Sequence, residues 1–313
     1  MAKKGSRGWR DRCWKGVASL LLSAVGVGAY AQPAPTDAPR LIAPFVDARA
    51  VAVDPAGVVY VVEGAREAIV TLRNHLPDER RLGGRGSEAG QFDGLADIDP
   101  TNGLVLVVAD AGNGRIQRFS REFLFLESLP VDRREAGAEA GGYTSYRKQE
   151  QGGSSGQGRP IAVRTSHAEE TFVVDVDRHV VLKWDRERNF EREIGGYDAG
   201  DGALIEPVAL ALDQAQRTLF VLDIGRGAVM VYDFLGGFER LMALDPAGDA
   251  IGLEVWGEEL MVFEQDRVVR YHARGHREAE YAVDLGEPIV DMAWSAAGVY
   301  ALTKRALYRL DLH

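Results

Sequence analysis

Three observations predict an all-β fold, a six-bladed β-propeller. A pattern of short β-runs and turns recurs six times along the 313 residues. Most steps between copies are 39–48 residues long, which is the length of one four-stranded blade. The last copy is one strand short, and a spare β-run precedes the first copy. We expect that spare run to complete the last blade, which closes the ring and removes an open sheet edge.

The N-terminal 31 residues precede the repeats and are predicted to be a signal peptide. Six basic residues and one acid lie within the first 15, and an uncharged, mostly apolar run follows from Gly16 to Ala31. This run ends in Ala29-Tyr30-Ala31, a small-residue cleavage motif, and it is short for a membrane span of about 20 residues. We expect cleavage after Ala31, location in the periplasm or outside the cell, and no transmembrane span after cleavage. The alternative is an uncleaved anchor.

Charge and cysteine content narrow the function classes. The formal net charge is −10, and the predicted signal peptide carries +5, so the mature chain carries −15. Nucleic-acid binding needs a basic surface, so no nucleic-acid partner is expected. The single cysteine, Cys13, lies inside the signal peptide, so the mature chain has no disulfide. Residues 32–39 are Pro-rich and are predicted to be a flexible lead-in.

The repeats occupy residues 40–313. The copies are residues 48–72, 82–120, 153–185, 195–233, 250–272 and 288–310. The residues that close the second strand of each copy, here called the closing residues, are Glu63, Asp110, Asp175, Asp223, Glu264 and Thr303. One step of 65 residues holds a Gly-, Ser-, Glu- and Arg-rich segment, 131–158, which is predicted to be a flexible insertion. The closing strand of the ring is expected at Arg40–Phe45.

The copy at 82–120 resembles the NHL repeat. It has a glycine-rich turn, Gly90-Gln91-Phe92, a β-run ending in Val107–Asp110, and the run Asn113–Phe119. The resemblance is good for the copies that begin at 153 and 195, and weaker in the first copy and the last two. Proteins with this repeat are β-propellers, so the resemblance implies the same fold as the spacing.

The residues that begin each inner strand are mostly acidic. When the copies are aligned by eye on this position, five acids and one arginine occur there, with one gap allowed for Asp93. These residues, here called the collar, are Asp47, Asp93, Arg159, Glu206, Asp249 and Glu287. Three residues further on, small side chains dominate: Ala50, Ala96, Ala162, Ala209 and Gly252, with Val290 as the exception. The collar is predicted to lie at the mouth of the central channel, where acids favour a bound cation.

Arginines in the turns after the second strands offer an alternative role for the collar. They are Arg66, Arg115, Arg178, Arg226 and Arg267, and Arg305 lies close to the equivalent place in the last copy. We expect these turns on the same face as the collar, here called the top face. Arginine–carboxylate pairs would then neutralise the collar and tie blades together. The closing acids Asp110, Asp175 and Asp223 belong to the repeat pattern and are expected to be structural.

Two functions follow from this pattern. The first is a non-catalytic module that binds a protein, peptide or glycan through its top face and needs no cofactor, because no H-E-x-x-H and no inner-strand histidine occurs. The second is a hydrolase or lyase that uses one divalent ion, Ca²⁺, Mg²⁺, Mn²⁺ or Zn²⁺, held by Glu206, Asp249 and Glu287. It is similar in architecture to gluconolactonase-like propellers, although the asparagine that those carry is missing here. The amidating lyases, whose propellers are similar, need channel histidines that this chain lacks.

Overall fold

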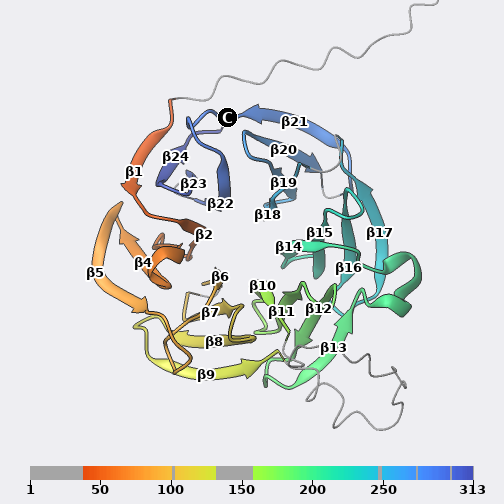
Figure 1. The fold of residues 1–313 in the computed structure, drawn as a ribbon. Helices are drawn as coiled ribbons and strands as arrows, with labels where there is room; N and C mark the ends of the chain where they lie inside the picture. The colour runs from red at the N-terminus through yellow and green to blue at the C-terminus, as the bar shows by residue number, and fades with distance from the viewer. Residues whose placement is uncertain are drawn as a thin grey trace, which may run out of the picture. The chain divides into compact units, whose positions relative to one another are not determined.

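The computed structural model describes residues 38–100, 103–131, 158–245, 249–272, 274–296 and 298–312. The predicted signal peptide, most of the lead-in and all but the ends of the 131–158 insertion lie outside this range. Six antiparallel four-stranded sheets stand in a ring (Figure 1). The prediction of six blades is therefore confirmed. In the described part of the chain, no helix is long and apolar enough to cross a membrane.

Each blade is a meander whose first strand lies innermost. The first three blades are β2 (Ala48–Val53), β3 (Val59–Glu63), β4 (Ala68–Arg73) and β5 (Leu76–Gly83); β6 (Leu95–Asp99), β7 (Val105–Asp110), β8 (Arg115–Ser120) and β9 (Phe125–Pro130); and β10 (Pro160–Thr165), β11 (Thr171–Asp175), β12 (Val180–Trp184) and β13 (Phe190–Ile194). Two short 3₁₀ helices, η1 (Gly64–Arg66) and η2 (Tyr197–Gly202), lie in connections.

The last three blades follow the same order, except that the sixth takes its outer strand from the N-terminal side. They are β14 (Pro207–Asp213), β15 (Thr218–Asp223), β16 (Ala228–Asp233) and β17 (Phe238–Ala243); β18 (Gly252–Trp256), β19 (Glu259–Phe263), β20 (Arg267–His272) and β21 (Arg277–Ala282); and β22 (Ile289–Ser295), β23 (Gly298–Thr303), β24 (Ala306–Leu310) and β1 (Arg40–Pro44).

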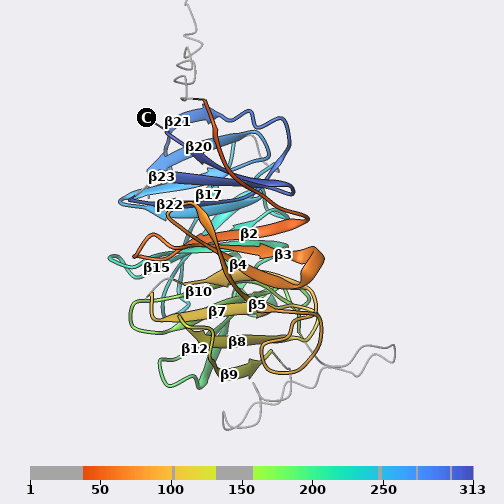
Figure 2. The same ribbon diagram turned by 90° about the vertical axis from the view of Figure 1, so that its left-hand side faces the viewer.

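The ring closes through β1, which pairs antiparallel with β24 (Figures 1 and 2). Leu41 lies opposite Tyr308, and Ala43 lies opposite Leu307. Ala43 is buried in the apolar cluster between blades 6 and 1. This arrangement confirms the expected closing strand, and it leaves the last blade with the same four strands as the others.

The core is divided among the interfaces between neighbouring blades. Six apolar clusters are present among the described residues, one at each of the six blade-to-blade contacts. The second strands, such as β3 and β11, are buried along their whole length, because blades cover both of their faces. This explains their nearly continuous Val, Leu and Phe content. Outer strands such as β13 keep an exposed face.

Candidate functional site

The closing residues are buried and hold the top face together. Asp110, Asp175 and Asp223 are fully buried, and Glu63 and Glu264 are nearly so. Four of these carboxylates accept the backbone N–H of a residue just before the inner strand of the same blade. The donors are Val46, Asp93, Arg159, and Ile205 together with Glu206, at 2.7–3.2 Å. Each of these four acids therefore ties the start of one inner strand to the end of the second strand beside it.

Asp110 shows the arrangement most completely. Its carboxylate accepts hydrogen bonds from Asp93 N at 2.9 Å, Arg115 Nε at 2.8 Å, and the side-chain amides of Asn113 and Gln117. In blade 6 the closing residue is neutral: Thr303 Oγ1 accepts the N–H of Ala306, the first residue of the third strand, at 3.0 Å. The closing position therefore needs a buried hydrogen-bond acceptor, and a charge is not essential to it.

The five top-face arginines serve the closing acids and not the collar. Ion pairs of 2.6–2.8 Å join Arg66 to Glu63, Arg115 to Asp110, Arg178 to Asp175 and Arg267 to Glu264; Arg226 lies 4.0 Å from Asp223. The alternative expectation, that these five arginines neutralise the collar, is therefore wrong. They fall three to five residues after the closing acid, and the tight turn brings four of the guanidinium groups back onto that acid. Arg226 Nε instead donates to the carbonyl of Ala203 at 2.8 Å.

The collar residues lie near the top ends of the inner strands, and only some of them form ion pairs. Asp47, Arg159 and Glu206 directly precede the first residue of β2, β10 and β14, whereas Asp93 and Glu287 lie one residue further from β6 and β22. Some members have exposed or weak ion pairs: Asp47 with Arg49 at 3.1 Å, Asp93 with Arg85 at 3.6 Å, Arg159 with Asp177 at 2.9 Å, and Glu287 with Arg305 at 3.5 Å. In the described part of the chain, Glu206 and Asp249 have no ion pair.

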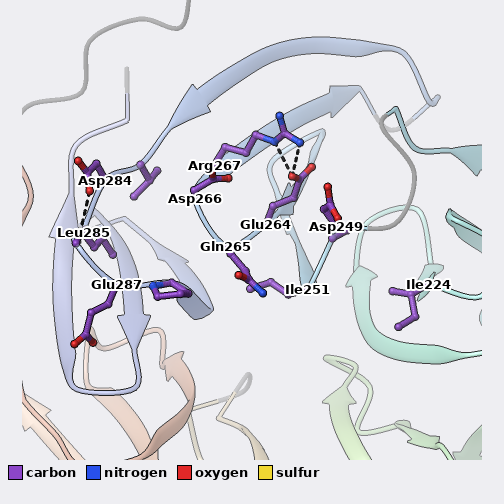
Figure 3. Close-up of a pocket in the computed structure, with 14 residues that line it drawn as sticks. Ile224, Asp249, Ile251, Glu264, Gln265, Asp266, Arg267, Asp284, Leu285 and Glu287 are labelled. Atoms are coloured by element: carbon purple, nitrogen blue, oxygen red, sulfur yellow. Dashed lines mark hydrogen bonds and ion pairs between the residues drawn. The ribbon is translucent and has the colours of Figure 1, made fainter.

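A cavity of about 800 Å³ opens beside blade 5 on the top face (Figure 3). It is lined by residues 249–251, 264–267 and 283–288, together with Ile224 from blade 4. These segments contribute five carboxylates and one guanidinium, Arg267, which is paired with Glu264. Asp249 and Asp266 are exposed and have no ion pair with any described residue. The cavity, here called the acidic pocket, therefore has an excess of negative charge.

The three proposed metal ligands do not meet in one place. Glu206 is absent from the lining of the acidic pocket, and the carboxylates of Asp249 and Glu287 lie on opposite sides of it (Figure 3). Over the described ranges, no three Asp, Glu, His or Cys side chains gather closely enough to hold a metal ion. The divalent-ion site stays a prediction from the sequence, and this side-chain arrangement does not preform it.

A second charged group lies at the ring axis and was missed by the sequence reasoning. It comprises Asp97, Asp99, Arg164, Glu254 and Asp291, from inner strands β6, β10, β18 and β22 (Figure 1), and is here called the axial cluster. Asp97 Oδ2 accepts Arg164 Nη1 at 2.7 Å and the N–H of Val163 at 2.8 Å. The carboxylate of Asp291 likewise accepts the N–H of Val51 at 2.7 Å. These two acids therefore join blade 2 to blade 3 and blade 6 to blade 1.

Ionisation in the axial cluster is strongly perturbed. Burial raises the pKa of Glu254 to about 7; nearby Asp99 and Asp97 add to the rise, and Arg164 opposes it. Burial also raises the pKa of Asp291 to about 7, helped by Asp97 and opposed by the Val51 hydrogen bond and Arg164. Burial alone would lower the pKa of Arg164, but the four carboxylates outweigh it and keep the pKa above its usual value. Carboxyls with such shifted pKa values deserve testing as functional groups.

No family model matches this chain, and no curated protein matches it. Solved propellers do resemble it in fold. Virginiamycin B lyase from Staphylococcus aureus is 9% identical with a TM-score of 0.57, over 84% of this chain and 79% of that one. A luciferin-regenerating enzyme is 10% identical with a TM-score of 0.61, over 88% and 95% of the two chains. A chain of a nidogen/laminin complex is 12% identical with a TM-score of 0.59, over 79% and 84%.

The common property of these structures is the β-propeller. Identities this low show the fold alone, and the set includes two enzymes and a protein complex. The fold therefore does not choose between catalysis and binding. The choice depends on the side chains of the top face.

Proposed function

We propose that this protein is a non-catalytic binding module that acts outside the cytoplasm and holds a positively charged side chain of a partner protein or peptide. The observation that carries the proposal is the charge of the acidic pocket. Glu264 is engaged by Arg267, but Asp249 and Asp266 have no ion pair with a described residue. A cationic group that enters the pocket would supply that missing charge and would be drawn there by the surrounding field.

The walls of the pocket favour a cation that is carried on an aliphatic stem. Ile224, Ile251 and Leu285 are half-buried, and they line the pocket together with the buried Val283. Lysine and arginine side chains bury their methylene groups against such surfaces and keep their charged ends beside carboxylates. The combination of apolar wall and unpaired acids supports a basic side chain over a bare inorganic ion.

The lining of the pocket does not favour catalysis by a nucleophile and a base. Its described residues contribute carboxylates, one amide and one guanidinium, but no His, Ser, Thr, Cys, Lys or Tyr. Covalent catalysis by a hydroxyl, thiol or amine nucleophile therefore has no candidate among these residues. Binding without chemistry is therefore the function that these residues support best.

A peptide titration tests the proposal. A short peptide with one central lysine should bind the mature chain, and the same peptide with norleucine, which keeps the stem without the charge, should bind at least tenfold more weakly. The double change Asp249→Asn with Asp266→Asn should weaken lysine-peptide binding about tenfold, because two carboxylates lose their charge. The matched control is Asp201→Asn, an exposed acid on η2, which should leave affinity unchanged.

Three results would contradict the proposal. Equal affinity for the lysine and norleucine peptides would remove the role of charge. Equal affinity of the double variant and the Asp201→Asn control would remove the acidic pocket as the site. Capture of a glycan with no capture of the lysine peptide would place another ligand class there. A saturable rise in melting temperature with one of Ca²⁺, Mg²⁺, Mn²⁺ or Zn²⁺, lost in Glu206→Ala, would favour the metal-dependent alternative.

A further inference from the structure

Two arginines lie directly opposite each other where the ring closes. In the pairing of β1 with β24, Arg40 faces Arg309, and in the pairing of β24 with β23, Arg309 faces Tyr300. Directly opposed residues project from the same face of a sheet, here the face of blade 6 that packs on blade 1, because Tyr300 belongs to the apolar cluster between these blades. Like charges in this relation are destabilising. These three residues, Arg40, Arg309 and Tyr300, form a row across the sheet. The two positive charges in this row would be stabilised by a negatively charged group.

The described residues offset these charges only weakly. Arg309 Nη2 lies 3.7 Å from Asp311, and its Nε is buried without a hydrogen-bond partner. Arg40 is exposed and has no ion pair with any described residue. The guanidinium of Arg309 lies over Gly298, where an added Cβ would come within 2.7 Å of Nε. The absence of a side chain at Gly298 therefore gives Arg309 its place in the row.

A histidine from blade 1 completes the group. His75 lies in the two-residue turn between β4 and β5, where Asn74 and His75 have φ of 50° and 64°. This hairpin geometry strongly favours glycine at the second position, so a histidine there is held in a strained conformation. His75 Nε2 lies 3.1 Å from the hydroxyl of Tyr300, the third member of the row. The strained turn therefore places the imidazole of His75 near Arg40 and Arg309.

We propose that Arg40, Arg309 and His75 form a binding site for a tetrahedral oxyanion, a phosphate or sulfate group, at the seam between blades 6 and 1. Guanidinium groups bind such anions through paired N–H donors, and a single oxyanion between Arg40 and Arg309 removes their repulsion. The unpartnered Nε of Arg309 supplies one donor. This site lies on different blades from the acidic pocket and does not depend on the proposed function.

Binding at this seam should strengthen in acid. Burial lowers the pKa of His75 below its usual value, and Arg309 and Arg40 lower it further. The charged and titratable groups around it are Arg40 on β1, Arg309 and Asp311 at the end of β24, and Tyr300 on β23; on its own hairpin, Arg73 is paired with Asp78 at 3.3 Å. An anion beside His75 stabilises the imidazolium, so anion binding takes up a proton.

Sulfate is the best probe because its charge does not change between pH 5 and 8. We expect saturable sulfate binding to the mature chain by calorimetry, in chloride buffer of matched ionic strength, at least threefold tighter at pH 5.5 than at pH 7.5. Arg40→Gln, on the exposed strand, and Arg309→Gln should each weaken it at least fivefold. Arg81→Gln, an exposed arginine on β5 with no ion pair to a described residue, should not change it.

The variant His75→Gly separates the imidazole from the turn. Glycine suits the φ at this position, so the hairpin should be kept while the gain in affinity at pH 5.5 is lost. A parallel titration with phosphate at pH 7.5 distinguishes the two sources: tighter binding of phosphate indicates a phosphorylated ligand, and tighter binding of sulfate a sulfated one. Sulfate that binds no better than chloride, or equal binding by Arg40→Gln and Arg81→Gln, would overturn the site.

Discussion

Replacing Asp110 with alanine should lower the free energy of unfolding by about 3–5 kcal/mol, which corresponds to a fall in melting temperature of about 5–15 °C for a domain of this size. The change removes the acceptor of the Asp93 N–H and of Arg115 Nε, and one of the acceptors of the Asn113 and Gln117 side-chain amides. A buried group that loses its partner bears the full cost of its own desolvation.

The matched control for this change is Asp177→Ala. Asp177 also pairs with an arginine, Arg159 at 2.9 Å, but both side chains are more than half exposed. Exposed ion pairs contribute at most about 1 kcal/mol, so this variant should melt within about 2 °C of the wild type. Thermal melts by circular dichroism at one pH make the comparison. Equal melting temperatures for the two variants would show that burial of the closing acid does not hold the top face.

Lowering the pH from 8 to 6 should stabilise the propeller through its axial cluster. The pKa values of Glu254 and Asp291 are raised to about 7 in the folded chain, whereas both carboxyls titrate near pH 4 when unfolded. The folded state therefore binds more protons between these values, and its stability falls as the pH rises through 7. Between its unfolded and folded pKa values, each group changes the free energy of unfolding by at most about 1.4 kcal/mol per pH unit. Lowering the pH from 8 to 6 should therefore raise the free energy of unfolding by about 1–3 kcal/mol through the two groups together.

Glu254→Gln isolates this effect from other titrations. The side chain of Glu254 has no hydrogen bond or ion pair with a described residue, and glutamine keeps its shape without a charge. We expect the variant to be more stable than the wild type at pH 8 and closer to it at pH 6. Glu258→Gln, an exposed acid on the same hairpin, should track the wild type at both values. A stability difference between Glu254→Gln and wild type that does not change with pH would contradict the shifted pKa.

The fold was predictable from the sequence because each blade repeats the same local pattern. The copies at 82–120 and 195–233 keep the turn, the buried second strand and the closing acid, so six blades and the closing strand at Arg40 were predictable. The NHL resemblance agrees with this fold, and it stays a resemblance because no family model matches.

The axial cluster was missed because of the register of two inner strands. A β-bulge interrupts the pairing of five inner strands near their first residues, including β6 and β22. The alignment by eye was off by one residue in these two blades, so it placed Ala96 and Val290 where the pairing places Asp97 and Asp291. A one-residue slip exchanges the two faces of a strand. In the corrected register, two acids stand where the other blades have Ala50, Ala162, Ala209 and Gly252, and that contrast is the signal.

The top-face partners were not predictable for a different reason. Arginine and acid recur together in every copy except the last, but spacing alone does not say whether Arg178 reaches the collar residue or the closing acid. The turn decides this, and it places Arg178 Nε 2.6 Å from Asp175. The acidic pocket also depends on segments that are distant in sequence, such as Ile224 and residues 283–288.

We propose that the buried top-face acids stabilise the fold and that the exposed ones bind a ligand. The most direct test measures melting temperature and lysine-peptide affinity on the same two variants, Asp223→Asn and Asp249→Asn. Asp223 is fully buried and accepts three backbone N–H groups, whereas Asp249 is exposed in the acidic pocket. We expect Asp223→Asn to melt at least 5 °C lower with peptide affinity kept while it is folded, and Asp249→Asn to melt like the wild type with affinity reduced at least threefold. Peptide affinity unchanged in Asp249→Asn would contradict the account.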